Sequence, residues 1–282
     1  MSRPSIVFLP GTLCDERLFA PQIAALSPFA DCSVGDVAAA DSLAECARHI
    51  LACAPDRFAL CGLSWGGILA LEILRQEPER VQRLALLNCS ARPASEETRA
   101  RQQRFVGMSQ LGEFREITTD FLKDAMLHPE HRQDLSLRRT VLAMAEAVGR
   151  ERFIQQVKAQ LNRPDARPFL SQIRCPTLVL GGREDAVCTV AMHEEIAAAI
   201  PGAELLILER CGHLSTLEQP ERVNEVLLRW LASEPASHPN RKATRYDHPL
   251  SETRQKRRRA CRRRRPGRSH GARHPGRLPG PR

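Results

Sequence analysis

Short apolar runs and amphipathic stretches alternate along much of this 282-residue chain. The apolar runs have the length of strands buried on both faces of a sheet, and they cover residues 5–10, 57–61, 84–88, 176–180 and 204–208; residues 31–37 form a further short strand pattern with polar ends. The stretches between them repeat apolar residues at helical spacing, at residues 16–27, 41–53, 65–76, 189–200 and 217–233. This alternation predicts an α/β fold, with a mostly parallel sheet covered by helices on both faces.

The alternation stops after the strand at 84–88, because residues 92–165 contain no apolar run of strand character. This segment has the pattern of several amphipathic helices, rich in Arg and Gln and interrupted by Pro129 and Pro164. A helical insertion at this place predicts a lid that shapes a pocket and excludes water, although its Phe and Met residues also fit a plain packing face. The predicted organisation is an α/β core at 1–91 and 168–235, a helical cap at 92–167 and a tail at 236–282.

A nucleophile motif follows the strand at 57–61. The sequence Gly62-Leu63-Ser64-Trp65-Gly66 has the form G-x-S-x-G between a strand and a helix, which is typical of a nucleophile elbow. The turn is tight, so the residues two before and two after the serine must be small. A glycine-rich turn with an incidental serine is the alternative, so the partners of Ser64 decide between the two.

A serine nucleophile needs a general base, and the base needs an acid that orients it. His213 is the histidine that directly follows a predicted strand, across a Cys-Gly hinge. Asp185 follows the preceding strand, and its neighbour Glu184 is the rival acid. The order Ser64, Asp185, His213, each residue after a separate strand, is the order found in α/β hydrolases.

Two backbone regions are candidates to bind the negative charge that develops on the substrate. The N–H of Trp65 opens the helix after the elbow, where the helix dipole favours negative charge. The loop after the first strand is expected to supply a second donor, at Thr12 or Leu13, and the sequence leaves the choice open. An ordinary turn after a strand is the less favoured interpretation of this loop.

The net charge of +9 conceals two different parts. From residue 239 onward, 16 Lys and Arg residues stand against two acids, so this part carries +14 and the remainder carries −5. The tail at 236–282 has almost no apolar content, which predicts a solvated, disordered extension. A nucleic-acid-binding arm is the less favoured interpretation, because the tail lacks interleaved aromatic residues for base stacking.

The cysteines and the length of the apolar runs indicate what to expect of metal binding, membrane contact and localisation. The ten cysteines form no C-x-x-C pair and no Cys/His cluster with zinc spacing, so we expect no metal. No apolar run approaches the roughly 20 residues that a membrane span needs, and the N-terminus has no signal-peptide pattern. We therefore expect a cytoplasmic protein that makes no membrane contact.

The four loops described above resemble the signature loops of the α/β-hydrolase superfamily, in particular bacterial carboxylesterase-like enzymes such as pimeloyl methyl-ester esterases and meta-cleavage-product hydrolases. They are Leu9–Leu13, Gly62–Gly67, Gly182–Asp185 and Cys211–His213. The resemblance covers about residues 5–234 and implies about six strands, acyl-enzyme chemistry and no cofactor. Pro10 stands where this family usually has histidine, which leaves the oxyanion donor in this loop open.

The residues and the resemblance together predict a serine hydrolase of a small carboxylic ester, with the triad Ser64, His213 and Asp185. The same triad also fits a thioesterase, an acyltransferase, a C–C bond hydrolase or a perhydrolase. An alternative of another class is a non-catalytic hydrolase-like scaffold whose basic tail binds nucleic acid. The sequence does not indicate the substrate or the oligomeric state.

Overall fold

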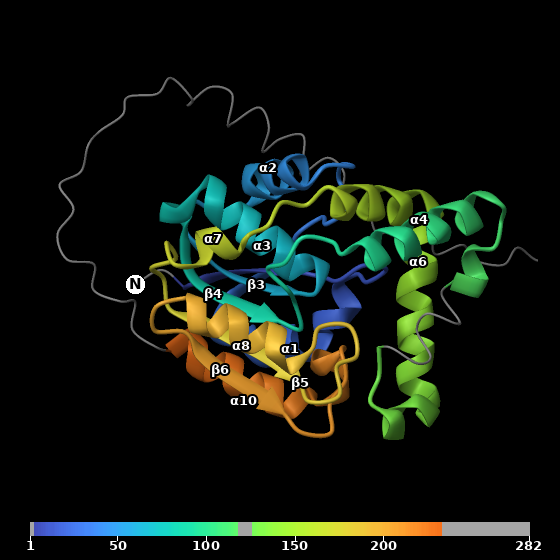
Figure 1. Cartoon of the computed structure of the whole chain (residues 1–282). Helices are drawn as coiled ribbons and strands as arrows, with labels where there is room; N and C mark the ends of the chain where they lie inside the picture. The colour runs from blue at the N-terminus through green and yellow to red at the C-terminus, as the bar shows by residue number, and fades with distance from the viewer. Residues whose placement is uncertain (1–2, 118–125, 233–282) are drawn as a thin grey trace, which may run out of the picture. The chain divides into compact units, whose positions relative to one another are not determined.

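The computed structural model describes residues 3–117 and 126–232. In this part of the chain a six-stranded sheet has the order β2-β1-β3-β4-β5-β6, and every neighbouring pair is parallel (Figure 1). The strands are β1 (Ser5–Leu9), β2 (Asp31–Val34), β3 (Phe58–Leu63), β4 (Val81–Leu87), β5 (Thr177–Gly182) and β6 (Glu204–Leu208). The predicted α/β fold with about six strands is confirmed, and the sheet is parallel throughout.

Helices cover both faces of the sheet, and Figure 1 shows α2 and α3 above it and α10 below it. The covering helices are α1 (Ala20–Leu26), α2 (Leu43–Cys53), α3 (Trp65–Gln76), α8 (Val190–Ala199) and α10 (Pro220–Ala232). Alternate residues of a strand enter different cores: Ile6 and Phe8 pack with α1 and α10, whereas Val7 and Leu9 pack with α2 and α3. This two-sided burial explains why the inner strands β1, β3 and β5 are apolar at nearly every position.

Some boundaries differ from the sequence-based expectation, each for a local reason. The helix expected at 16–27 begins as a 3-10 turn, η1 (Glu16–Phe19), before α1. The strand expected at 84–88 begins earlier, since Val81 already pairs with Phe58. The helix expected at 217–233 is divided into α9 (Ser215–Glu218) and α10, because the residue before Pro220 is driven out of helical geometry.

The segment between β4 and β5 contains helices and no strand within its described residues. They are α4 (Glu96–Gln110), η3 (Pro129–Gln133), α6 (Leu135–Leu161) and α7 (Arg167–Leu170), and the short turn η2 (Pro78–Arg80) precedes β4. Gly149 breaks α6 into two parts with a φ of 76°. The predicted tail at 236–282 lies outside the described residues.

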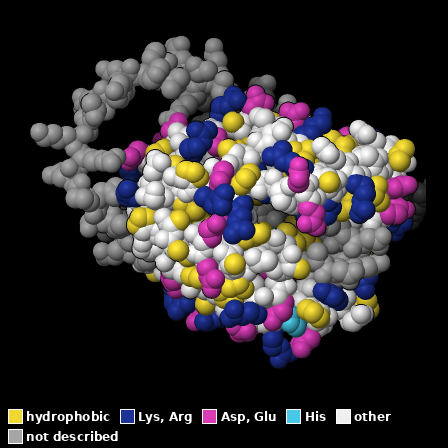
Figure 2. Space-filling view, viewed as in Figure 1, with side chains coloured by type: hydrophobic (Ala, Val, Ile, Leu, Met, Phe, Trp, Pro, Cys, Tyr) yellow, Lys and Arg dark blue, Asp and Glu magenta, His cyan; other side chains and the backbone are white. Residues whose placement is uncertain are grey.

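Charged side chains of both signs are interspersed over the face seen in Figure 2 and do not gather in a single-sign patch. Several form ion pairs, such as the half-buried pair of Arg92 with Glu195 and the exposed pair of Arg183 with Glu209. In the described part of the chain, no helix is both long and apolar enough to cross a membrane.

Candidate active site

Ser64 lies in the turn between β3 and α3, and its backbone has a φ of 55° and a ψ of −115°. Non-glycine residues rarely adopt a positive φ, so the turn is strained. A Cβ on Gly62 would lie 2.3 Å from the carbonyl oxygen of Gly66, and a Cβ on Gly66 would lie 1.8 Å from that of Leu9. Only glycine fits on both sides of the serine, which is the steric condition of a nucleophile elbow.

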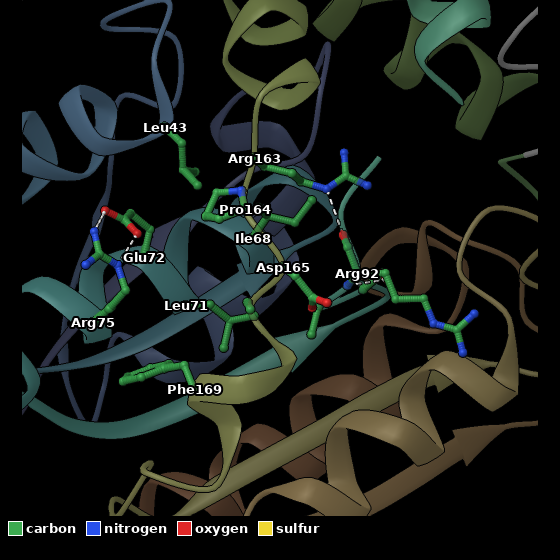
Figure 3. Close-up of a pocket in the computed structure, with 13 residues that line it drawn as sticks. Leu43, Ile68, Leu71, Glu72, Arg75, Arg92, Arg163, Pro164, Asp165 and Phe169 are labelled. Atoms are coloured by element: carbon green, nitrogen blue, oxygen red, sulfur yellow. Dashed lines mark hydrogen bonds and ion pairs between the residues drawn. The ribbon is translucent and has the colours of Figure 1, made fainter. Parts of the chain in front are cut away.

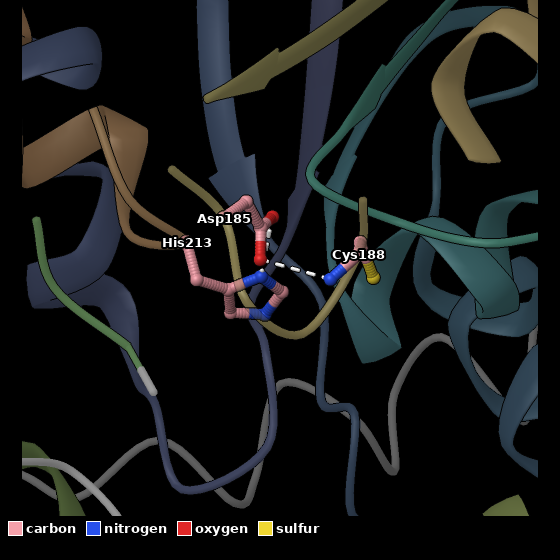
Figure 4. Close-up of side chains that lie close together, drawn as sticks. All are labelled: Asp185, Cys188 and His213. Carbon is pink, nitrogen blue, oxygen red and sulfur yellow. Dashed lines mark hydrogen bonds and ion pairs between the residues drawn. The ribbon is translucent and has the colours of Figure 1, made fainter. Parts of the chain in front are cut away.

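Asp185 and His213 follow β5 and β6 and lie in direct contact (Figure 4). The carboxylate Oδ2 of Asp185 accepts a hydrogen bond from Nδ1 of His213 at 2.8 Å, and both side chains are at most 1% exposed. Glu184, the rival acid, instead accepts the backbone N–H of Cys211 at 3.0 Å. Of the two acids, Asp185 therefore contacts the histidine.

Hydrogen bonds saturate the Asp185 carboxylate. Its Oδ1 accepts the backbone N–H groups of Val187 and Cys188, each at 2.8 Å, and its Oδ2 also accepts Nδ2 of Asn88 at 3.0 Å. Burial alone would raise the pKa of Asp185, but attraction to His213 and these hydrogen bonds outweigh it and lower that pKa below its usual value. The carboxylate is thus ionised and acts as a fixed acceptor for the imidazole.

Asn88 is a site residue that the sequence analysis missed. It follows β4 directly, and its side chain donates to Asp185 Oδ2 and to the carbonyl oxygen of Gly212 at 3.2 Å, while its Oδ1 accepts the hydroxyl of Ser215 at 2.5 Å. A polar residue at the carboxyl end of the strand between β3 and β5 was the available signal. Asn88 joins the loops of the acid and of His213.

The second ring nitrogen of His213, Nε2, is buried and has no hydrogen-bonding partner among the described residues. The Nδ1 hydrogen bond fixes the tautomer, because an ionised carboxylate can only accept. Nε2 of the neutral ring therefore carries a free lone pair. Ser64 is tied to the same edge through its backbone N–H, which donates to the carbonyl of Leu87 at 2.9 Å.

The loop after β1 lies against the elbow, since a Cβ on Gly11 would be 3.5 Å from the Cβ of Ser64. Its two candidate donors differ. The N–H of Leu13 donates to Oε1 of Gln156 at 3.1 Å, whereas the N–H of Thr12 has no partner among the described residues. Thr12 is held instead through its hydroxyl, which accepts Nε2 of Gln160 at 2.9 Å.

Trp65 is the first residue of α3, where a backbone N–H has no acceptor within the helix. Its indole donates to the carbonyl of Val37 at 2.8 Å, and the residue is 1% exposed. Two backbone N–H groups beside the elbow, of Thr12 and Trp65, therefore have no hydrogen-bonding partner within residues 3–117 and 126–232.

Asp185, Cys188 and His213 have possible metal-ligand atoms within 4.8 Å of one another, a grouping found within the described residues and drawn in Figure 4. Hydrogen bonds already occupy two of the three groups, since Asp185 accepts both the backbone N–H of Cys188 and Nδ1 of His213. Burial and the nearby charge of Asp185 raise the pKa of the Cys188 thiol well above its usual value.

A cavity of about 360 Å³ lies elsewhere, between α3 and the 163–169 stretch (Figure 3). Its wall combines apolar side chains such as Ile68 and Phe169 with the Glu72–Arg75 ion pair. Ser64, Asp185 and His213 do not line it. This cavity is therefore separate from the candidate active site.

Comparison with known proteins gives a consistent result. Residues 6–226 match the model of the alpha/beta hydrolase family. Pimeloyl-[acyl-carrier protein] methyl ester esterase of Aromatoleum aromaticum is 25% identical over 259 residues, 78% of this chain and 95% of that protein. 3-Oxoadipate enol-lactonase 2 of Acinetobacter baylyi is 31% identical over 173 residues, 59% of this chain and 61% of that protein.

Solved structures agree on the fold. A hydrolase from Pseudomonas aeruginosa PA01 matches with a TM-score of 0.73 and 25% identity, over 82% of this chain and 91% of that one. The enol-lactonase from Burkholderia xenovorans LB400 matches with a TM-score of 0.73 and 21% identity, over 83% and 93%. These matches confirm the resemblance drawn from the four loops: the chain belongs to the alpha/beta hydrolase family.

Proposed function

We propose that this chain hydrolyses carboxylic esters through an acyl-enzyme formed on Ser64. One observation carries the proposal: His213 is buried with Nδ1 bonded to Asp185 and Nε2 unpartnered, at the sheet edge where Ser64 occupies a strained turn. An imidazole held in this way, with Nδ1 bonded to a carboxylate and Nε2 free, can take a proton from a serine hydroxyl. Among the described residues, Ser64 and His213 share no hydrogen bond. Relatives named as a methyl ester esterase and an enol-lactonase support an ester as the substrate.

The proposed reaction has two halves. The Ser64 hydroxyl oxygen bonds to the carbonyl carbon while His213 Nε2 takes its proton. The bond to the alcohol then breaks, and the alcohol leaves with that proton. Water next attacks the acyl carbon and gives a proton to Nε2, after which the bond to Ser64 breaks and the serine recovers its proton. Asp185 stabilises the imidazolium in both halves.

The N–H groups of Thr12 and Trp65 are the proposed donors to the oxyanion. The N–H of Leu13, the other candidate, already donates to Gln156. Two such donors, fixed before the reaction, favour the developing charge over the neutral carbonyl. The helical segment at 92–167 is proposed as the cap of this site, since its residues Gln156 and Gln160 contact the loop that carries the oxyanion donor.

Labelling with a fluorophosphonate probe tests the proposal. Wild type should form one adduct, located at Ser64 by peptide mass, and Ser64→Ala should form none. Turnover of p-nitrophenyl acetate should fall at least about a thousandfold in this variant, the scale of losing a triad nucleophile. An adduct at another residue, or near-normal turnover by Ser64→Ala, would reject the triad. A panel of a methyl ester, an enol lactone and an acyl thioester then separates esterase from lactonase and thioesterase.

A further inference from the structure

Glu218, the last residue of α9, is a buried carboxylate beside the loop of His213. Its side chain is fully buried, with 0% exposure. Its Oε1 accepts the backbone N–H groups of Gly212 at 3.1 Å and of Leu214 at 3.2 Å, the two residues that flank His213. A carboxylate with this geometry binds the loop at both sides of the imidazole.

The other polar groups of this loop are also bonded. The backbone N–H of His213 donates to the carbonyl of Met126 at 3.0 Å, and the carbonyl of Gly212 accepts Nδ2 of Asn88 at 3.2 Å. A Cβ on Gly212 would lie 2.8 Å from Glu218 Oε1, so the carboxylate packs directly on the loop backbone. All three N–H groups of residues 212–214 are thus bonded. Glu218 accepts those of Gly212 and Leu214, and the Leu214 N–H is shared with the carbonyl of Met126 at 3.2 Å.

The second oxygen of Glu218 binds a different segment. Oε2 accepts the backbone N–H of His128 at 2.7 Å and Nδ1 of His131 at 2.9 Å. His128 and His131 belong to the 92–167 segment, at the start of η3. One buried carboxylate therefore joins the loop of His213 to this helical segment.

We propose that Glu218 is a positioning residue for His213, acting through the backbone of residues 212–214. The proposal rests on the proposed function, in which His213 is the base. Asp185 fixes the rotation and tautomer of the imidazole, and Glu218 fixes the backbone from which the imidazole extends. A displacement of about 1 Å in a reacting group costs about 100-fold in rate, so loss of these two hydrogen bonds should lower kcat far more than it changes KM.

The test uses the full chain with Glu218→Met and Glu218→Ala, which remove the acceptor, and Glu218→Gln, which keeps one acceptor oxygen. Glu72→Met is the matched control, because Glu72 is also buried, at 4% exposure, but pairs with Arg75 on α3. On p-nitrophenyl acetate, the acceptor-free variants should lose about 100-fold in kcat, and Glu72→Met should stay near wild type. Glu218→Gln should lie between them, because its one carbonyl oxygen can serve only one of the two pairs of donors.

Two further readouts separate positioning from general destabilisation. In a His213→Ala background, Glu218→Met should cause no additional loss of rate, because it acts through the imidazole. The downfield proton resonance of His213 Nδ1–H, assigned by its loss in His213→Ala, should disappear in Glu218→Met and persist in Glu72→Met. Thermal melting shows which variants are folded. If Glu218→Met and Glu218→Ala do not fold, the kcat of Glu218→Gln tests the proposal instead.

The proposal is overturned if a folded acceptor-free variant keeps the resonance and wild-type kcat, if Glu218→Gln is indistinguishable from wild type, or if the rate falls equally in the His213→Ala background. Absence of Ser64 labelling in wild type would instead reject the proposed function. The resonance needs no turnover, so in that case its loss in Glu218→Met still supports the positioning of His213, and its persistence overturns it.

Discussion

Gln156→Glu is the substitution that most directly examines the assignment of Thr12 and Leu13. The new carboxylate can still accept the N–H of Leu13, which Gln156 binds at 3.1 Å. The shape of the side chain is conserved, and Gln156 is only 1% exposed, so solvent screens the added charge poorly. The substitution therefore adds a negative charge beside the proposed oxyanion site without removing a hydrogen bond.

The expected loss of kcat follows from the repulsion between the new carboxylate and the oxyanion, which would be bound by adjacent N–H groups. For the acceptors of the neighbouring Thr12 and Leu13 N–H groups we take a separation of about 6 Å, roughly two hydrogen-bond lengths. At an effective dielectric constant of about 20, two unit charges at that distance repel by about 3 kcal/mol. Electrostatic repulsion of this size, acting in the transition state, lowers kcat by about 100-fold.

The assay is kcat for p-nitrophenyl acetate from about pH 6 to pH 9, because a buried carboxyl group titrates late and the deficit should grow as it ionises. Gln156→Met is the control: it leaves the N–H of Leu13 unbonded, costing about 1–3 kcal/mol of stability, but adds no charge. A folded Gln156→Glu whose kcat stays within about threefold of that of Gln156→Met up to pH 9 would refute this placement of the oxyanion.

Two other predictions concern the elbow and the acid. Gly66→Ala should abolish activity and lower the melting temperature, since its Cβ would lie 1.8 Å from the Leu9 carbonyl oxygen. The control Gly107→Ala has no atom within 4 Å of its new Cβ, so its melting temperature should be unchanged or higher. Equal effects of the two substitutions would contradict the steric argument. Because the pKa of Asp185 is lowered on folding, its ionisation stabilises the fold above about pH 4, and this contribution is lost as the pH falls through the lowered value. The difference in melting temperature between wild type and Asp185→Asn should therefore become smaller in acid. A difference that does not change with pH would contradict the proposed stabilisation by ionised Asp185.

The sequence was sufficient to predict the fold and to bring Asp185 and His213 to one edge of the sheet. Each follows a continuous apolar run, and the carboxyl ends of parallel strands meet at one edge, so no long-range contact had to be known. The choice between Asp185 and Glu184 was harder, because neighbouring side chains point in different directions. The structure separates them through the Cys211 N–H, which Glu184 accepts.

Contacts across the helical segment could not be predicted. Leu13 and Gln156 are 143 residues apart, and Thr12 and Gln160 are 148 apart. Amphipathic spacing indicates which face of a helix is apolar, but it does not fix where that helix crosses a loop. Glu218 lies within the helix expected at 217–233, but that pattern does not indicate its contacts with the loop of His213 or with His128 and His131.

The strand order explains why His213 is held by so many groups. β3, which precedes Ser64, is three strands from β6, a separation of about 14 Å at usual strand spacing. A histidine placed directly after β6 would be too far from Ser64 to act as the proposed base. In this chain several residues separate Leu208 from His213. A free loop of that length does not hold a side chain to hydrogen-bond accuracy. β4 and β5, the strands in between, supply Asn88 and Asp185, which bind this loop and its imidazole, and Glu218 binds the loop backbone beyond them. The separation of the strands that precede the proposed nucleophile and the proposed base thus accounts physically for the concentration of buried polar contacts on one short loop.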